Sequence, residues 1–182
     1  MAGNEEELKS TSHSSNNKNI ILVGMMATGK STVGAILAEQ LGYELVDLDQ
    51  VIIETEGRSI AEIFADNGEE YFRRVETEVL KRMLKDKKKI ISTGGGAVLA
   101  PGNTLLMLEN GIVVALTASE EEIISRVSGD HKRPLLAGNA EEKVRRIMEQ
   151  RRDAYLFAHY TVDTTGLNTV QVSEHILMHY RG

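Results

Sequence analysis

The chain has 182 residues, of which 41% are hydrophobic and 26% are charged, and these proportions are ordinary for a single globular domain. Its formal net charge of −6 and its aromatic content of 4% argue against a broad nucleic-acid surface. It has no cysteine, which excludes disulfides, thiolate metal sites and thiol nucleophiles and suits a reducing compartment. No apolar stretch approaches the roughly 18 residues of a membrane span. We therefore expect a cytoplasmic protein with neither a nucleic-acid nor a membrane partner.

Residues 1–18 form a polar segment that contains Glu5, Glu6 and Glu7 and no apolar stretch. This pattern is typical neither of a secretory signal nor of an organellar transit peptide. We expect a flexible polar leader without function over these residues. The rest of the chain, 19–182, shows no internal repeat and no domain linker, and is expected to form one domain.

Apolar strands and amphipathic helices alternate along this domain. In chain order, the pattern predicts a strand at 20–23, a helix from 30 that stops at Gly42, a strand at 43–49, helical structure from about 60 through 84, and a strand at 88–93. It then predicts a strand at 111–117, a helix at 120–128, a loop at 128–140, a helix from 141 to about 156, a strand at 160–164 and a helix near 169–180.

Three local signals mark where the helices begin or break. Ser59 with Glu62, and Ser119 with Glu122, have the spacing of capping boxes. A break is expected near 67–68, where glycine follows asparagine. Strands that alternate with helices predict right-handed crossovers and a parallel sheet of about five strands, covered on both faces. Because ligands of such sheets bind at the carboxyl ends of the strands, the residues just after each strand are the candidates for a site.

The segment "GMMATGKS" at 24–31 matches the phosphate-loop pattern G-x-x-x-x-G-K-[ST] in full, between a predicted strand and a predicted helix. The glycines allow the backbone N–H groups to face a chain of phosphates. Lys30 can reach the outer phosphates, and Ser31 offers a hydroxyl to Mg²⁺. The segment therefore predicts a nucleoside triphosphate site.

Two carboxylates, Asp47 and Asp49, end the second predicted strand. On a strand, residues two apart point to the same side, so we expect both side chains to face one spot near the phosphate loop. One could hold magnesium while the other binds a substrate hydroxyl. The alternative is an acidic strand end that caps the next helix, and this alternative suits Asp49 taken alone.

Five segments in order, "GMMATGKST", "VDLDQVI", "GRSIAEIFADNGEEYFRRVE", "STGGGAV" and "KRPLL", resemble the shikimate kinase family, and the resemblance runs from about residue 19 to the C-terminus. It implies a three-layer α/β/α P-loop kinase fold with a mobile lid at about 128–140 and a helical substrate-binding region. It also implies a monomer that transfers phosphate from ATP, with Mg²⁺, to the 3-hydroxyl of shikimate, giving shikimate 3-phosphate and ADP in chorismate and aromatic amino-acid biosynthesis.

The resemblance also implies roles for individual residues. The nucleotide would be held by Met26, Ala27, Thr28, Gly29, Lys30, Ser31, Thr32, Arg126 and Arg133, and the metal by Ser31 and Asp47. Shikimate would be held by Asp49, Arg73, Gly94, Gly95, Gly96 and Arg151, while Lys30, Asp49 and Arg133 would serve catalysis. In this scheme Arg126 lies near the adenine and Arg133 is the arginine of the lid. Arg73 and Arg151 would bind the shikimate carboxylate, with Glu76 orienting Arg73, and the planar fork of an arginine suits a carboxylate better than a lysine does.

The chain departs from the usual family pattern at three site positions. Ala27 stands where the family commonly has glycine, Leu48 where it has serine or threonine, and Asp153 where it often has proline. The last departure leaves open whether Arg151 or Arg152 takes the carboxylate.

"STGGGAV" at 92–98 contains three consecutive glycines and no lysine, so it is not a second phosphate loop. Three glycines predict that no side chain intrudes where a ligand lies against the backbone. Two other functions remain open: another small-molecule or nucleotide kinase of the same fold, and a non-catalytic relative that only binds. A non-catalytic relative would be expected to lack Lys30, Asp47, Asp49 or a substrate arginine, and all are present.

Overall fold

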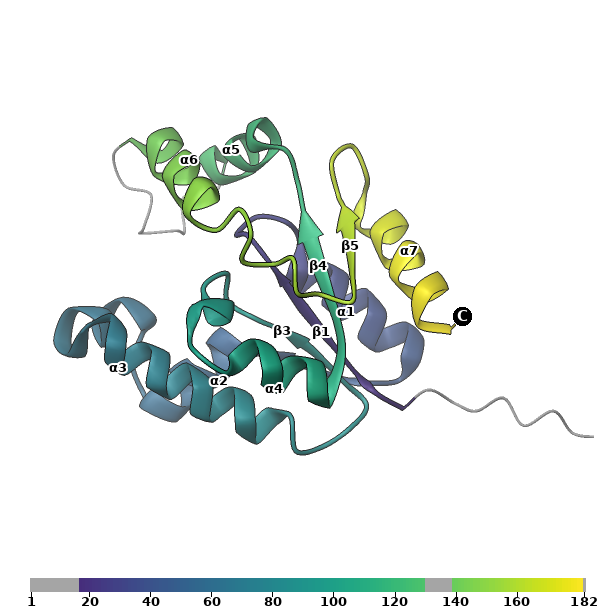
Figure 1. Cartoon of the computed structure of the whole chain (residues 1–182), viewed down its shortest axis with the longest axis horizontal. Coiled ribbons are helices and arrows are strands. Elements are labelled where there is room, and N and C mark those ends of the chain that lie inside the picture. Colours follow the sequence, from purple (N-terminus) through teal and green to yellow (C-terminus); the bar gives the residue numbers. More distant parts are fainter. Residues whose placement is uncertain (1–16, 130–138, 182) are drawn as a thin grey trace, which may run out of the picture.

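The computed structural model describes residues 17–129 and 139–181 (Figure 1). Its centre is a sheet with the strand order β2-β3-β1-β4-β5. The strands are β1 (Asn19–Gly24), β2 (Glu44–Asp47), β3 (Lys89–Ser92), β4 (Gly111–Thr117) and β5 (Tyr160–Asp163). All four pairings are parallel, which confirms the predicted five-stranded parallel sheet. The carboxyl ends of the strands therefore meet at one edge of the sheet.

The helices form layers on both faces of this sheet. They are α1 (Lys30–Leu41), α2 (Leu48–Glu56), α3 (Ile60–Met83), the short 3₁₀ helix η1 (Ala97–Leu99), α4 (Asn103–Asn110), α5 (Glu120–Ser128), α6 (Ala140–Gln150) and α7 (Thr169–Arg181). Helices α1 and α7 pack together on one face, and α2, α3 and α4 cover the other (Figure 1). Helices α5 and α6 lie side by side beyond the carboxyl ends of the strands (Figure 1).

Strand β1 is buried along its whole length and supplies side chains to both halves of the core. Ile20 and Leu22 pack in the cluster formed with α1 and α7. Ile21 and Val23 pack in the cluster on the opposite face, which includes the helices α2 and α3. Alternate side chains of a strand point to opposite faces, so a strand between two helical layers must be apolar at every position.

Several predicted helix ends are confirmed. Gly42 ends α1 with φ of 65°, a left-handed conformation that glycine adopts without steric cost. Ser59 and Glu62 form both halves of a capping box at the start of α3. Gly68 interrupts α3 with φ of 80° and ψ of 175°, at the predicted break.

Three predictions about the helices were incomplete or wrong. Helices α2 and α4 were not predicted. The helix expected to run to about 156 ends at Gln150, and 151–157 form turns. In these turns the Tyr155 hydroxyl donates to the Gly95 carbonyl, a contact that joins distant parts of the chain. The second capping box is only half formed: the Glu122 N–H donates to Ser119 Oγ (3.2 Å), but the Glu122 carboxylate bonds Arg126 and Gly166 instead. The N–H of Gly166, which is remote in the sequence, has taken the place of the Ser119 N–H as a donor to the Glu122 carboxylate.

Two expected segments lie outside the described residues. The polar leader falls there except for its last two residues, 17 and 18, and so does most of the lid expected at 128–140. The structure describes no helix that is both long and apolar enough for a membrane span within the two ranges it covers.

Candidate active site

The phosphate loop connects β1 to α1 and is stabilised by its own backbone carbonyls. Lys30 is only 9% exposed, and its ammonium donates to the carbonyl oxygens of Gly24 (2.9 Å) and Met25 (2.7 Å). The Thr28 hydroxyl donates to the Met25 carbonyl as well (2.8 Å). Gly29, with φ of 90°, stands at the N-terminus of α1, where free N–H groups and the helix dipole favour an anion. The loop has the form that a phosphate chain requires.

Gly24 and Ala27 of the phosphate loop both have backbone conformations that disfavour a β-carbon, and of the two only Ala27 has one. Gly24 has φ of 140°, and a β-carbon there would collide with the carbonyl oxygen of Leu116 on β4. Ala27, by contrast, adopts a left-handed conformation with φ of 61°. A residue with a β-carbon is disfavoured there, and this is the position where the family pattern has glycine.

The two aspartates do not share a strand, so the expectation that strand periodicity brings both to one spot was wrong. Strand β2 ends at Asp47, and α2 begins at Leu48. Asp47 caps this helix by accepting the Gln50 N–H at Oδ1 (3.2 Å), so the capping role belongs to Asp47 and not to Asp49. The other oxygen of Asp47 lies 3.4 Å from Ser31 Oγ, beside the phosphate loop. The helix begins early because a capping aspartate satisfies one of its free N–H groups.

Asp49 instead lies in the first turn of α2 and faces the triple glycine that follows β3. A β-carbon placed on Gly94 would be 2.9 Å from Asp49 Oδ1. The two carboxylates thus serve two neighbouring places, the phosphate loop and the glycine loop, which we define as Gly94–Gly96.

Each glycine of the glycine loop has a different candidate substrate side chain against it. Gly94 faces Asp49, a β-carbon on Gly95 would lie 3.0 Å from Arg151 Nη1, and a β-carbon on Gly96 would collide with the guanidinium of Arg73. We expected the glycines to make room for a ligand. The structure adds that they make room for the side chains proposed to bind that ligand.

Arg73 is held in place by carboxylates of its own helix, α3. Its Nη1 donates to Glu76 Oε1 (2.7 Å), and its Nη2 lies 3.3 Å from Glu69 Oε1. Glu76 is 1% exposed, and its second oxygen has no hydrogen-bond partner among the described residues. Burial raises the pKa of the Glu76 carboxyl, and the positive charge of Arg73 only partly opposes this effect. A buried acceptor without a partner is unusual and is available to a ligand hydroxyl.

Arg151 and Arg152 have different surroundings. Arg151 directly follows α6 as its C-cap and is half-buried beside Gly95. Arg152 pairs with Glu149, and 70% of its side chain is exposed. The structure brings Arg151 to the glycine loop and leaves Arg152 in solvent.

Tyr155 belongs to this site and was missed in the sequence. It is 7% exposed, and its hydroxyl donates to the Gly95 carbonyl at 2.6 Å. Burial raises the pKa of this phenol, against the opposing effect of the Arg151 charge, so the group stays a neutral donor. No pattern in the sequence could have revealed it, because the contact joins residues 60 positions apart.

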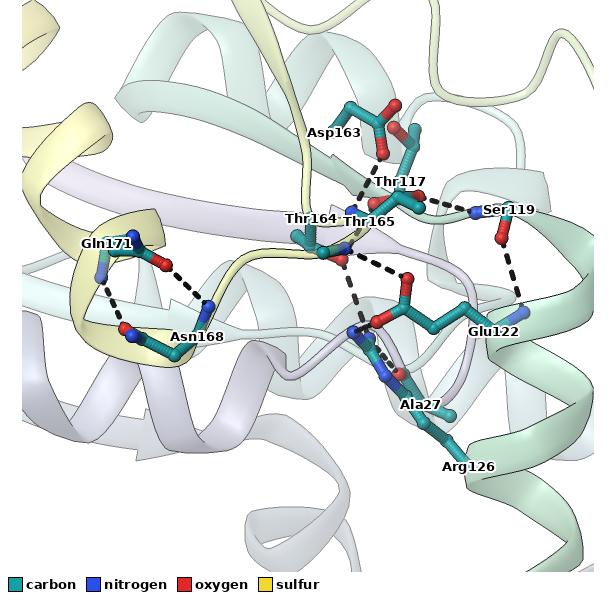
Figure 2. Close-up of polar contacts among 11 residues, drawn as sticks. Ala27, Thr117, Ser119, Glu122, Arg126, Asp163, Thr164, Thr165, Asn168 and Gln171 are labelled. Carbon is teal, nitrogen blue, oxygen red and sulfur yellow. Dashed lines mark hydrogen bonds and ion pairs between the residues drawn. The ribbon is translucent and has the colours of Figure 1, made fainter.

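Arg126, on α5, contacts the backbone of the phosphate loop at Ala27 (Figure 2). Its Nη1 donates to the Ala27 carbonyl at 2.9 Å, and its Nη2 pairs with Glu122. Arg133, the expected lid arginine, lies outside the described residues. A cleft of about 290 Å³ opens between the phosphate loop, α5 and α6. It shares Arg151 and Tyr155 with the glycine-loop site, but Asp49 and Arg73 do not line it.

The oxygens near the phosphate loop suit magnesium. Ser31 and Asp47 provide a hydroxyl and one carboxylate, and Mg²⁺ in such sites takes its other ligands from water and phosphate. No cluster of three or more acidic, histidine or cysteine side chains that could hold a metal occurs in the ranges 17–129 and 139–181. Ser31 and Asp47 are thus the two side chains beside the phosphate loop that could contact such an ion.

A phosphate loop at the carboxyl edge of a parallel sheet defines a P-loop kinase fold. The neighbouring glycine loop is lined by one carboxylate and two arginines, and the arginines could bind a small anion. The comparisons with known proteins specify the family. The family model described as shikimate kinase matches residues 26–181. The shikimate kinase of Geobacter sulfurreducens is 46% identical over 159 residues, covering 87% of this chain and 88% of the relative. That of Persephonella marina is 42% identical over 160 residues, covering 88% and 97%.

Solved structures agree with the sequence comparisons. The shikimate kinase from Acinetobacter baumannii in complex with shikimate superposes with a TM-score of 0.84 at 39% identity, covering 89% of this chain and 92% of that one. The enzyme from Aquifex aeolicus gives 0.77 at 34% identity, covering 88% and 94%. The chain belongs to the shikimate kinase family, and the resemblance found in its motifs is confirmed.

Proposed function

We propose that this chain transfers the γ-phosphate of ATP to the 3-hydroxyl of shikimate. The observation that carries the proposal is the meeting of the two loops. A β-carbon on Gly95 would lie 3.4 Å from the Gly24 carbonyl oxygen and 3.6 Å from the Met26 nitrogen, so the glycine loop touches the phosphate loop. A ligand held at one loop is therefore next to a ligand held at the other, and phosphoryl transfer depends mainly on such positioning.

The donor side of the proposed reaction uses the phosphate loop, with Met26, Ala27, Thr28, Gly29, Lys30, Ser31 and Thr32 around the phosphates. The loop amides and Lys30 stabilise the charge that develops on the transferred group. When bound, Mg²⁺ neutralises negative charge on the β- and γ-phosphates. Ser31 and Asp47 would hold it, since their oxygens already lie together beside the loop.

The acceptor side of the proposed reaction uses the glycine loop and the side chains packed on it. Arg73 and Arg151 provide two guanidinium groups for the carboxylate of shikimate. Asp49 orients the acceptor hydroxyl and accepts its proton. Glu76 fixes Arg73 with one oxygen, and its second oxygen is available to a ring hydroxyl. Four neighbouring ionisable groups would thus recognise one small, polar anion.

The remaining proposals concern regions and context. Arg133 would neutralise phosphate charge from a lid over about 128–140, Arg126 would lie at the adenine, and the domain would span 19–182 behind a leader at 1–18. The chain would act as a monomer in the cytoplasm. The absence of cysteine suits a reducing compartment.

The test is ADP formation by the purified full chain with Mg-ATP, with and without shikimate. Turnover that requires shikimate supports the proposal. Turnover only with a nucleoside monophosphate would favour a nucleotide kinase, and ligand binding without turnover would favour a non-catalytic relative.

A variant tests the acceptor assignment. Arg73→Ala is expected to raise the KM for shikimate by about 30-fold or more, because a charged hydrogen bond is lost, while the Kd for ATP stays unchanged. Arg74→Ala, on the same helix and with 68% of its side chain exposed, is the matched control and should behave like the wild type. Equal losses of shikimate and ATP affinity in Arg73→Ala would contradict the assignment.

A further inference from the structure

Arg126 and Glu122 connect three parts of the chain at the edge of the phosphate loop (Figure 2). Both lie on α5, one helical turn apart, and they form an ion pair. Arg126 Nη1 donates to the Ala27 carbonyl in the phosphate loop (2.9 Å) and reaches the Thr164 hydroxyl after β5 (3.5 Å). The second carboxylate oxygen of Glu122 accepts the Gly166 N–H at 3.2 Å. One helix therefore holds two loops that are remote from it in the sequence.

We call the Arg126–Glu122 pair and its hydrogen bonds to the two loops the bridge. The two loops that it joins, the β5–α7 loop and the phosphate loop, differ in how firmly they are held. On the β5–α7 side, Thr164 is 2% exposed, and both its N–H and its hydroxyl donate to the Thr117 carbonyl (2.7 and 2.9 Å). The Thr165 hydroxyl in turn accepts the Ser119 N–H (2.9 Å). This side is tied to β4 and to the start of α5. Because this side is fixed, the guanidinium of Arg126 can in turn hold the Ala27 peptide of the phosphate loop.

The other end is the one residue of the phosphate loop in a disfavoured conformation. Ala27 has φ of 61°, where a β-carbon crowds the backbone, and only one other described non-glycine residue, Lys88, has a positive φ. Glycine at this position would adopt the conformation without that cost. The Arg126 bond is made to the carbonyl of this residue, so it holds the peptide that follows the strained φ.

We propose that Arg126 is a positioning residue that keeps Ala27 in the left-handed conformation needed by the phosphate loop, and that Glu122 fixes Arg126 for this role. The inference rests on the proposed nucleotide site and adds to it. In the sequence, Arg126 was expected to lie near the adenine. Its hydrogen bond to the loop backbone is a second task, which concerns the phosphates and not the base.

The residue types suit the bridge. An arginine presents five N–H donors in a planar fork and can bond Ala27 and Glu122 at once, whereas a lysine ammonium at the same place cannot span both. A glutamate has two acceptor oxygens, for Arg126 and for the Gly166 N–H. Glutamine has one oxygen, so one of the two donors would face an amide NH₂. Arg126→Lys keeps the charge and Glu122→Gln keeps the shape, yet each is expected to break the bridge.

The probe that isolates this role is inorganic tripolyphosphate, which has phosphates but no base. We expect Arg126→Lys and Glu122→Gln to weaken binding of both tripolyphosphate and Mg-ATP about five-fold in calorimetric titrations of the full chain. This factor corresponds to the cost of a left-handed conformation for a residue with a β-carbon. Side-chain exposures of 31% and 27% for Arg126 and Glu122 make a large loss of stability unexpected, so thermal midpoints should stay close to that of the wild type.

Whether Glu122→Gln raises or lowers the affinity for tripolyphosphate shows whether Arg126 acts by positioning the loop or only by its charge. If Arg126 acted only as a positive charge near the phosphates, Arg126→Lys would leave tripolyphosphate affinity unchanged, and removing the negative charge of Glu122 would raise it. If Arg126 acted only on the base, neither variant would change tripolyphosphate binding. Either result overturns the proposal. Arg58→Lys is the matched control, since Arg58 pairs with Glu56 and Asp66, is about as exposed as Arg126, and has no hydrogen bond to the phosphate loop among the described residues.

A double-mutant cycle with Ala27→Gly completes the test. In the glycine background the left-handed conformation no longer needs the bond from Arg126, so Arg126→Lys should lose less than two-fold in tripolyphosphate affinity. An equal or larger loss in that background contradicts the proposal. If the wild type itself binds neither tripolyphosphate nor Mg-ATP, the proposed function fails instead, so the two failures are distinguishable.

Discussion

The phosphate loop and the glycine loop follow neighbouring strands, β1 and β3, and lie in contact, but their specificity has different origins. The phosphate loop carries its chemistry within eight consecutive residues, and Lys30 and Thr28 bond carbonyls only a few positions away. The glycine loop has no reactive side chain. Its chemistry comes from Asp49, Arg73 and Arg151, which belong to three other segments. Most of the donor site is therefore encoded locally, with Asp47 and Arg126 added by folding, whereas the whole acceptor site exists only after folding.

This difference predicts that a methyl group in the glycine loop acts through a distant side chain. In Gly96→Ala the new β-carbon would collide with the guanidinium of Arg73, which must move away from its place beside Glu76. We expect the KM for shikimate to rise about 30-fold, as for the loss of a charged hydrogen bond, while the Kd for Mg-ATP changes little. Steady-state kinetics and calorimetry measure both values. A loss confined to ATP binding would break the division between the two loops.

A smaller effect is expected when only the support of the glycine loop is removed. Tyr155→Phe keeps the ring but loses the hydroxyl that donates to the Gly95 carbonyl. We expect the KM for shikimate to rise about five-fold and the free energy of unfolding to fall by about 1 kcal/mol, as for one net neutral hydrogen bond. Denaturant titration separates the two effects.

Two comparisons show whether Tyr155 acts on the site or only on stability. Leu156→Ala, at a neighbouring side chain that is 73% exposed, is the control and should leave both quantities near wild type. If Tyr155→Phe lost stability but kept the wild-type KM for shikimate, Tyr155 would not position the glycine loop.

The smallest effect concerns Glu76 and tests whether burial or the ion pair dominates there. The pKa of the folded-state carboxyl is raised above its usual 4.5, so the native protein binds more protons than the unfolded chain above that pH. The stability due to this group is therefore present at lower pH and is lost as the pH rises through 4.5 and above. The free energy of unfolding of the wild type, minus that of Glu76→Gln, should fall over this range.

Chemical denaturation at a series of pH values measures this difference. If the attraction of Arg73 outweighed burial, the pKa would be lowered and the difference would rise with pH instead. The sign of the slope therefore decides between the two effects without reference to its size.

Local patterns predicted much of the fold. Patterns in the sequence predicted all five strands, of which β1, β3 and β4 were recognised as apolar runs. Gly42 and Gly68 were correctly placed at a helix end and a helix break, and the Ser59–Glu62 capping box formed. These features depend on backbone conformation or on a partner three residues away. Ser119 and Glu122 had the same spacing, yet Arg126 and Gly166 replaced half of that box, because an ionic partner outcompetes a local N–H.

In the candidate site, too, local patterns could not predict contacts between residues that are far apart in the sequence. Asp47 and Asp49 were both singled out as site residues, but strand periodicity was applied to them, whereas α2, capped by Asp47, begins at Leu48. Strand geometry would have placed both carboxylates together; helix geometry sends one to Ser31 and the other to Gly94. Between Arg151 and Arg152, the early end of α6 placed only the former against the glycine loop.

By itself, the sequence determined the parallel sheet, the phosphate loop and the family, because each depends on periodicity or on residues that are close along the chain. Only the tertiary structure decided which side chain lies on which glycine, where Tyr155 donates, and how Arg126 reaches Ala27. The Tyr155–Gly95 contact joins residues 60 positions apart, and the Arg126–Ala27 contact joins residues 99 positions apart. Their geometry depends on how whole helices pack across the edge of the sheet, and no local pattern records that packing.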